Sequence, residues 1–274
     1  MTRAETELEL LGEGREAETL AWGEHRVLRL LKDPTRIDRL ERELVALTAA
    51  RRGGAPVPAV YGRETVDGRP GLVIERVPGP DLLTLLGRRP WLVPRVARRL
   101  GETHARVHAV KLDAGLPTVH EVVRSAITDS ELVPGHFRRP ALDLLELLPE
   151  GDRLCHWDFH PANLLDGHTG PIVIDWSFAA RGHPAADVAR TRLIVSAGAR
   201  PSGPSSLIAR LDPLGRRLLI RLYMRAYRRS APLDQALVDR WTPLVAVVRL
   251  TAGIPEERGR LIEMFESSIQ LNGR

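Results

Sequence analysis

The chain has 274 residues, of which 43% are hydrophobic and 27% are charged, and its formal net charge is +5 at pH 7. This balance is typical of a globular protein and excludes a disordered or collagen-like chain. The sequence contains no apolar run long enough to span a membrane, no apolar secretion signal at its start and only one cysteine. We therefore expect a cytoplasmic protein that has no intramolecular disulfide.

The segment before residue 80 predicts short strands around one helix. Five apolar runs have the length and the flanking turn residues typical of strands, at 8–11, 19–22, 27–31, 59–61 and 72–74. Asp33 is a favourable N-cap residue, and Pro34 suits the first helical position because its missing N–H would have no partner there. Apolar residues then recur every three or four positions until Gly53, where the predicted helix ends.

The cluster Pro78-Gly79-Pro80 is the strongest boundary signal. We therefore predict one domain over residues 1–78 and a second over residues 79–274. The second carries leucine, valine or alanine at helical spacing near 91–110, 117–130, 137–148, 184–198, 205–230, 232–250 and 256–270. Two short apolar runs within it, 164–165 and 172–174, predict small strands. A strand-rich part followed by a larger helical part predicts a cleft between them.

Positive charge is concentrated toward the end of the chain. Residues 190–274 hold 15 arginines and 7 acidic residues, a net charge of +8, whereas the preceding residues sum to −3. Such a segment would suit an anionic partner. However, arginines spaced between leucines are typical of solvated helix faces, and Tyr223 and Tyr227, four residues apart, are typical of a core. We therefore expect no nucleic-acid binding.

The most informative stretch is 155–165, with the sequence CHWDFHPANLL. It contains His-x-Asp-x-x-x-x-Asn, the spacing of a kinase catalytic loop. In this spacing, the carboxylate of Asp158 faces an attacking hydroxyl, and the amide oxygen of Asn163 faces a magnesium ion. Twelve residues later, Asp175 follows a buried apolar run, where its carboxylate could bridge the metal to phosphate oxygens.

This block resembles that of the aminoglycoside phosphotransferase family, kinase-like enzymes that phosphorylate hydroxyls of small molecules. Residues 156–165 resemble the family's catalytic loop, 172–176 its metal strand and 182–189 the helix start that follows. The resemblance implies an α+β fold of bilobal, protein-kinase-like form. The N-terminal lobe would be a small antiparallel sheet with one helix, and the C-terminal lobe would be larger and mainly helical.

The resemblance also implies roles for individual residues. Asp158 would be the catalytic base, and Asn163 and Asp175 would be the Mg²⁺ ligands. Asp187 would brace the catalytic loop through hydrogen bonds without touching substrate. The neighbouring His156 and His160 would position the loop or serve only as structural histidines.

The N-terminal segment contains an ordered set of nucleotide-binding candidates. Gly12 and Gly14 occupy the place of a loop that covers a nucleotide and lets backbone N–H groups approach phosphates. Arg29 is the expected phosphate-binding cation on the third strand, and two-residue alternation puts Val27 on the same face, over the adenine. Glu43, in the following helix, is the expected partner of Arg29.

Two further features complete this set. Lys32 is a second candidate for the phosphate-binding cation, but it follows the strand and is expected in solvent. The run 72–78, which includes Glu75 and Val77, resembles the hinge whose backbone holds the adenine edge.

Three other functions compete with a small-molecule kinase. A metal-dependent hydrolase would use residues of this block as ligands, namely His156, Asp158, His160, Asp175 and His183. A catalytically silent, kinase-like binding protein would bind nucleotide without transferring phosphate. A protein kinase is disfavoured because Trp157 replaces the arginine that receives a phosphorylated activation loop, and only 11 residues separate Asp175 from Asp187.

The prediction is therefore a Mg²⁺-dependent enzyme, monomeric or homodimeric, that moves the terminal phosphate of ATP or GTP to a small-molecule hydroxyl. The acceptor would be an antibiotic of aminoglycoside, nucleoside, macrolide or peptide type, or alternatively a metabolite such as choline, a sugar or an amino-acid-derived alcohol. A polycationic acceptor would need a carboxylate-rich cleft, for which the candidates are Glu121, Asp129, Glu131, Asp143 and Glu146. The basic segment 190–274 favours a neutral or anionic acceptor instead.

Overall fold

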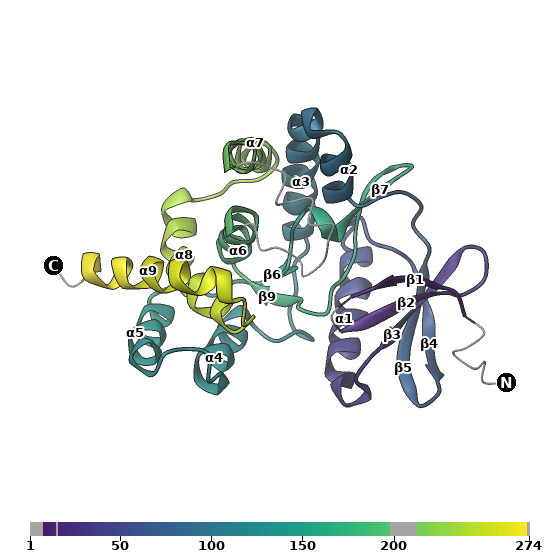
Figure 1. The fold of residues 1–274 in the computed structure, drawn as a ribbon, viewed down its shortest axis with the longest axis horizontal. Helices are drawn as coiled ribbons and strands as arrows, with labels where there is room; N and C mark the ends of the chain where they lie inside the picture. The colour runs from purple at the N-terminus through teal and green to yellow at the C-terminus, as the bar shows by residue number, and fades with distance from the viewer. Residues whose placement is uncertain (1–7, 15, 198–212, 273–274) are drawn as a thin grey trace.

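The computed structural model describes residues 8–14, 16–197 and 213–272. Its N-terminal part is an antiparallel sheet of five strands in the order β1-β2-β3-β5-β4. The strands are β1 (Leu10–Glu13), β2 (Ala17–Ala21), β3 (Arg26–Leu31), β4 (Val60–Val66) and β5 (Arg69–Glu75). One helix, α1 (Ile37–Arg52), packs against the sheet at the right of Figure 1. The predicted small sheet with one helix is confirmed.

The start and end of α1 follow the predicted signals. Asp33 accepts a hydrogen bond from the backbone N–H of Thr35 at 2.9 Å, and a short 3-10 turn, Pro34–Arg36, leads into the helix. The helix ends at Gly53. Its buried face carries apolar side chains together with one acid, Glu43, and this face therefore brings a carboxylate toward the sheet.

The remainder of the described chain is mainly helical. Its helices are α2 (Leu82–Arg88), α3 (Val93–His108), α4 (Val119–Asp129), α5 (Gly135–Glu146), α6 (Pro184–Ala197), α7 (Pro213–Ser230), α8 (Gln235–Leu250) and α9 (Pro255–Asn272). The sequence patterns predicted all of these except α2, which Asp81 caps by accepting hydrogen bonds from two backbone N–H groups. Residue 198 of the predicted helix 184–198 and residues 205–212 of the predicted helix 205–230 lie outside the described residues. No helix in the described part is long and apolar enough to cross a membrane.

Two small pairs of strands interrupt the helices. The predicted pair is present as the hairpin β7 (Leu164–Gly167) and β8 (Gly170–Val173). A second pair, β6 (Arg153–Cys155) and β9 (Ala180–Gly182), was not predicted. Its three-residue strands are too short to show a period, and each depends on a partner distant in sequence. Together the two pairs fix both ends of the segment that carries the proposed chemistry.

The connection between the sheet and the helical part is held against β7. Gly79 has a left-handed backbone, with φ 112°, and a Cβ atom there would overlap the carbonyl oxygen of Asp166. The N–H of Asp166 donates to the carbonyl of Pro80 at 2.9 Å, and the carboxylate of Asp166 pairs with Arg99 of α3.

Helices α3 and α7 pack unusually closely, at the top of Figure 1. A Cβ atom added to Gly101 of α3 would lie 2.6 Å from the backbone oxygen of Tyr223 on α7. The missing side chain therefore permits the approach. Tyr223 and Tyr227 are each 1% exposed, which confirms their predicted place in the core.

Candidate active site

A cleft of about 1700 Å³ lies between the sheet and the helical part. Its walls come from the β1–β2 hairpin, β3, α1, the loop after β5, the segment before β7, the end of β8, α6 and the end of α8. All ten residues predicted to bind nucleotide or metal or to catalyse line this cleft: Gly12, Gly14, Val27, Arg29, Glu43, Glu75, Val77, Asp158, Asn163 and Asp175. The structure therefore brings the predicted residues together.

The loop between β6 and β7 is tied to the end of β8. Nε2 of the buried His156 lies 3.0 Å from the carbonyl oxygen of Ile174, and the N–H of Ile174 donates to the carbonyl of Asn163 at 3.0 Å. Trp157 and Asp175 both have left-handed backbones, with φ of 63° and 61°, which non-glycine residues adopt rarely. Such backbones cost about 1 kcal/mol or more and are concentrated at functional sites.

Asp158 lies in the cleft as an ionised carboxylate. Its backbone carbonyl accepts a hydrogen bond from Nδ2 of Asn163 at 2.9 Å, and its Oδ2 lies 3.5 Å from Nε2 of His160. Burial works to raise the pKa of Asp158, but the His160 ring and Arg190 outweigh burial and lower it. The side chain can therefore accept a hydrogen bond or a proton from a hydroxyl group in the cleft.

Arg29 lies between two carboxylates. Its Nε is 2.9 Å from Oε2 of Glu43, as the sequence predicted, and its Nη2 donates to Oδ1 of Asp175 at 2.6 Å. Ser177 donates to the same oxygen at 2.8 Å, which leaves Oδ2 of Asp175 without a partner among these groups. Burial raises the pKa of Glu43 to about 7 against the opposing effect of Arg29. Lys32 does not line the cleft. As expected it lies toward solvent, where its partly exposed side chain pairs with Glu13.

The strand alternation of β3 places Val27 and Arg29 on one face of the sheet. Arg29 pairs with Thr19 of β2 on one side and with Leu72 of β5 on the other. Val27 lies two residues away on β3, and both side chains line the cleft, as alternation predicted. In the hairpin above them, the N–H of Gly14 donates to the carbonyl of Ala17 at 2.9 Å.

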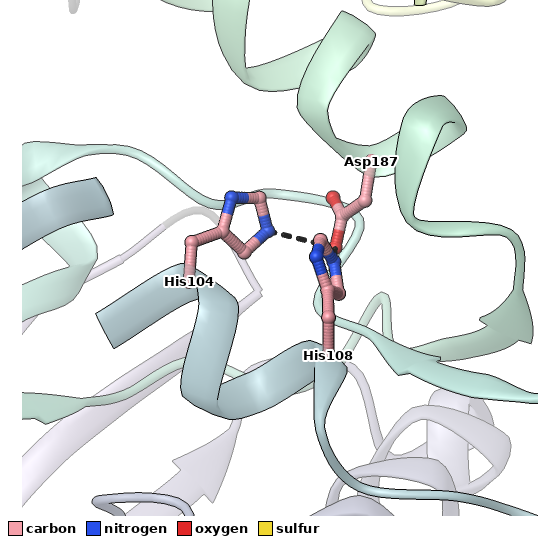
Figure 2. A group of neighbouring side chains, drawn as sticks. All are labelled: His104, His108 and Asp187. Atoms are coloured by element: carbon pink, nitrogen blue, oxygen red, sulfur yellow. Dashed lines mark hydrogen bonds and ion pairs between the residues drawn. The ribbon is translucent and has the colours of Figure 1, made fainter. Parts of the chain in front are cut away.

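Asp187, near the start of α6, holds the loop between β6 and β7 through backbone hydrogen bonds. Its Oδ2 accepts a hydrogen bond from the N–H of His156 at 2.6 Å, and its Oδ1 accepts one from the N–H of Trp157 at 3.1 Å. Figure 2 shows the rings of His104 and His108, both from α3, pointing at the same carboxylate. Their Nε2 atoms lie 3.2 and 3.3 Å from Oδ2.

Two tyrosines of α7 complete this network. The hydroxyl of Tyr223 lies 2.8 Å from Nδ1 of His104, and the hydroxyl of Tyr227 lies 2.7 Å from Nδ1 of His108. Burial works to raise the pKa of Asp187, but the two histidines hold it well below its usual range, so the carboxylate is ionised and cannot donate. Burial lowers the pKa of His104 to about 3, so its neutral ring donates from Nε2 and accepts from Tyr223 at Nδ1. His108 has the same geometry toward Asp187 and Tyr227.

The three ligating atoms of His104, His108 and Asp187 lie within 4.8 Å of one another, a spacing that could also hold a metal ion. We assign them to hydrogen bonding because both oxygens of Asp187 already accept backbone N–H groups. Sequence reasoning missed the role of all four ring-bearing residues. The available signal was that the two histidines of α3 and the two tyrosines of α7 are each four residues apart, so that each pair lies on one face of its helix.

Two alternatives that the sequence left open find no support in the cleft. None of the five acids proposed for a polycationic acceptor lines the described cleft, because they are exposed on α4, on α5 and on the segment between these helices. Instead Glu121 closes the capping box of α4, and Asp143 pairs with Arg139. Nor do the residues of the hydrolase hypothesis converge as metal ligands. Within the described ranges, the histidine and aspartate group around Asp187 is the only cluster with such spacing.

Comparison with known proteins identifies the relatives of this fold. Residues 7–233 match the profile of the phosphotransferase enzyme family. The structure is similar to the GDP and kanamycin complex of APH(2")-IIia, with 19% identity and a TM-score of 0.56 over 96% of this chain and 91% of that one. No curated protein matches the sequence.

Two further solved structures are similar. Macrolide 2'-phosphotransferase from Brachybacterium faecium has 18% identity and a TM-score of 0.54 over 94% of this chain and 91% of that one. Choline kinase from Streptococcus pneumoniae has 14% identity and a TM-score of 0.62 over 97% and 95%. At these identities the structures show the shared fold alone. Because the family profile spans most of the chain and the fold agrees with it, this chain belongs to the phosphotransferase enzyme family.

Proposed function

We propose that this protein transfers the terminal phosphate of ATP or GTP to a hydroxyl group of a small molecule. One observation carries the proposal: Asp158, Asn163 and Asp175 line a single cleft together with Arg29 and the β1–β2 hairpin. The acceptor would be an antibiotic or a metabolite alcohol. In this proposal, residues 1–78 form the nucleotide-binding lobe and residues 79–274 form the catalytic and acceptor-binding lobe.

The nucleotide would bind on the sheet side of the cleft. Arg29 would bind phosphate oxygens while Glu43 holds its guanidinium in place, and the backbone of Gly12 and Gly14 would cover the phosphates. Val27 would pack on the base, whose edge would face the chain at 75–77. The GDP in the kanamycin complex of the similar enzyme supports a nucleotide donor.

The donor set fits a magnesium ion. Asn163 uses its Nδ2 to donate to Asp158, which leaves its Oδ1 available, and Asp175 has an oxygen that Ser177 and Arg29 do not occupy. Amide and carboxylate oxygens are the ligands that this hard cation prefers. When bound, magnesium would neutralise charge on the transferred phosphate.

The chain's own groups would contribute mainly position and charge. Asp158 would accept a hydrogen bond from the acceptor hydroxyl, align its oxygen with the terminal phosphate and take its proton. Asp187 would keep the backbone at 156–157 fixed, so that Asp158 does not need to reorganise during transfer. Positioning of this kind supplies much of the acceleration in phosphoryl transfer.

The test is release of nucleoside diphosphate from Mg-ATP or Mg-GTP in the presence of a panel of hydroxyl compounds. We expect Asp158→Asn to reduce turnover by about 10²–10⁴-fold while the affinity for nucleotide changes little. The matched control is Asp143→Asn, at an exposed position on α5 outside the cleft, and it should leave turnover unchanged. Turnover by Asp158→Asn equal to that of the parent protein would remove the assignment of the base.

A further inference from the structure

One wall of the cleft lies beyond Asp158, on the side away from the sheet. It consists of residues from α6, the end of α8 and the following loop, namely Arg190, Ile194, Val248, Arg249 and 251–256. We call this set the acceptor wall, a name that depends on the proposed function. Among its residues, all of which the structure describes, Glu256 is the one acid and two are arginines.

The two arginines of the acceptor wall differ in their partners. Arg249 is neutralised by Glu257, with its Nε 2.8 Å from Oε2 and its Nη2 3.2 Å from Oε1. Among the described residues, Arg190 has no carboxylate at ion-pair distance, although the charge of Asp158 acts on it. Its Nε donates to the backbone oxygen of Trp157, and its guanidinium carbon lies 5.1 Å from the centre of the Trp157 indole ring.

The guanidinium of Arg190 is thus a buried cation with unused donors. Arg190 is only 9% exposed, and its Nη1 is closed off from solvent without a hydrogen-bond partner in the described part of the chain. Burial lowers the pKa of Arg190, with Arg249 adding to this effect and Asp158 opposing it. A buried guanidinium is normally paired, and its planar fork suits two oxygens of one carboxylate or phosphate.

The remainder of the wall is suited to an apolar body. Ile194 and Val248 are buried in the ligand-free fold, while Ile254 and Pro255 are partly or fully exposed at the cleft. A polycation would meet the positive charge of Arg190 at this wall, where Glu256 is the one wall carboxylate among the described residues. The wall therefore discriminates by charge against amine-rich acceptors.

We propose that the acceptor is an anionic hydroxy compound, whose carboxylate or phosphate group binds to Arg190 while its hydroxyl lies at Asp158. Arg190 is then a specificity-determining residue for the proposed transfer. Arg190 could instead bind the oxygens of the phosphate that is being transferred. In that case replacing Arg190 would weaken the binding of nucleotide, whereas in our proposal it weakens the binding of the acceptor.

The experiment uses the full chain and matched pairs of hydroxy compounds. The probes are 3-phenyllactate and its amide, glycerate and its amide, and kanamycin as a polycation. Binding is measured by calorimetry with Mg²⁺ and a non-hydrolysable ATP analogue, and turnover by release of ADP. For at least one pair, we expect the carboxylate to bind about tenfold or more tightly than the amide, because one charge-assisted bidentate contact is lost in the amide.

Two variants and a control then locate the preference. Arg190→Gln should reduce the ratio of affinities toward one, and Arg190→Lys, which keeps the charge, should retain part of it. Arg192→Gln is the matched control, since Arg192 lies on the same helix, pairs with Asp239 and does not line the cleft. It should retain the full ratio. Melting temperatures establish that each variant is folded.

Several results would overturn the proposal. Equal binding of each carboxylate and its amide by the parent protein would do so, and so would tighter binding of kanamycin than of any carboxylate. This comparison decides the matter even if the Arg190 variants fail to fold. If Arg190→Gln kept the parent protein's ratio of carboxylate to amide affinity but bound Mg-nucleotide more weakly, Arg190 would be assigned to the transferred phosphate instead.

The outcome also separates this inference from the proposed function. Arg190-dependent binding of carboxylates without release of ADP from any hydroxyl compound would refute phosphate transfer and leave the anion site standing. Efficient phosphorylation of kanamycin without carboxylate binding would support the transfer and refute the anion site.

Discussion

Replacing Tyr223 with phenylalanine should measurably destabilise the protein, although it removes only one oxygen atom. The hydroxyl lies 2.8 Å from Nδ1 of His104, a side chain with 0% exposure. Burial keeps the His104 ring neutral by lowering its pKa to about 3, and the ionised carboxylate of Asp187 accepts the proton on Nε2, so Nδ1 must accept a hydrogen bond. In Tyr223→Phe this acceptor is buried without a donor.

The expected magnitude follows from that loss. A buried polar atom left without a partner costs about 1–3 kcal/mol, so the free energy of unfolding should fall by about this amount. Tyr227→Phe should have a similar effect through His108, whose Nδ1 lies 2.7 Å from the Tyr227 hydroxyl. Because both histidines donate to one oxygen of Asp187, the double variant should depart from additivity by about 0.5 kcal/mol or more.

Urea unfolding followed by circular dichroism measures these changes, with Tyr61→Phe as the control. Tyr61 is 49% exposed on β4, and its replacement should stay within about 0.5 kcal/mol of the parent protein. A loss in Tyr223→Phe no greater than in Tyr61→Phe would refute the assignment of the tautomers. The same variants should reduce turnover more than nucleotide affinity, because Asp187 holds the backbone next to Asp158.

Three further predictions concern the same network and the metal. Burial lowers the pKa of His104 to about 3, so between pH 6.5 and this value the unfolded chain binds more protons than the folded one, and stability should fall as pH falls through this window. Urea midpoints measured across this range should show a flatter dependence in His104→Phe, and an equal slope would contradict the assignment. Gly101→Ala should lower the free energy of unfolding by about 2 kcal/mol or more, because its Cβ would lie 2.6 Å from the backbone oxygen of Tyr223. The control is Gly259→Ala on α9, where a Cβ meets open space, and thermal melting should find it neutral or stabilising. Chelation with EDTA should abolish turnover and leave the melting temperature of the ligand-free protein unchanged, whereas a fall in melting temperature would indicate a structural metal at His104, His108 and Asp187.

The candidate catalytic loop between β6 and β7 could be found in the sequence because its pattern is local. Asp158 and Asn163 lie five residues apart on one loop, and Asp175 follows the next hairpin, so their spacing can be recognised in the sequence. The sheet was readable for a similar reason, since turns and alternation are properties of short segments. From these local features the fold class could be predicted, together with the residues that the structure brings into one cleft.

The tertiary network could not be found in this way. His104 and Tyr223 are 119 residues apart, and each alone has the pattern of a core residue in a helix. Only the close packing of α3 on α7 makes them partners. The acidic residues between 121 and 146 illustrate a second limit. Counting them in the sequence could not show which side of the molecule they occupy, and none of them lines the described cleft. Glu121 was counted as a ligand candidate and is a helix cap.

The segment around Gly79 limits how the cleft can close. A proline- and glycine-rich link normally serves as a swivel between two bodies, but here it is fastened to the β7–β8 hairpin at Pro80 and Asp166, and Arg99 anchors that hairpin to α3. Rotation at this link would break these contacts together. In the proposed function, tightening of the cleft around a nucleotide would therefore come from bending of the β1–β2 hairpin and its neighbours, while the base of the joint stays stiff.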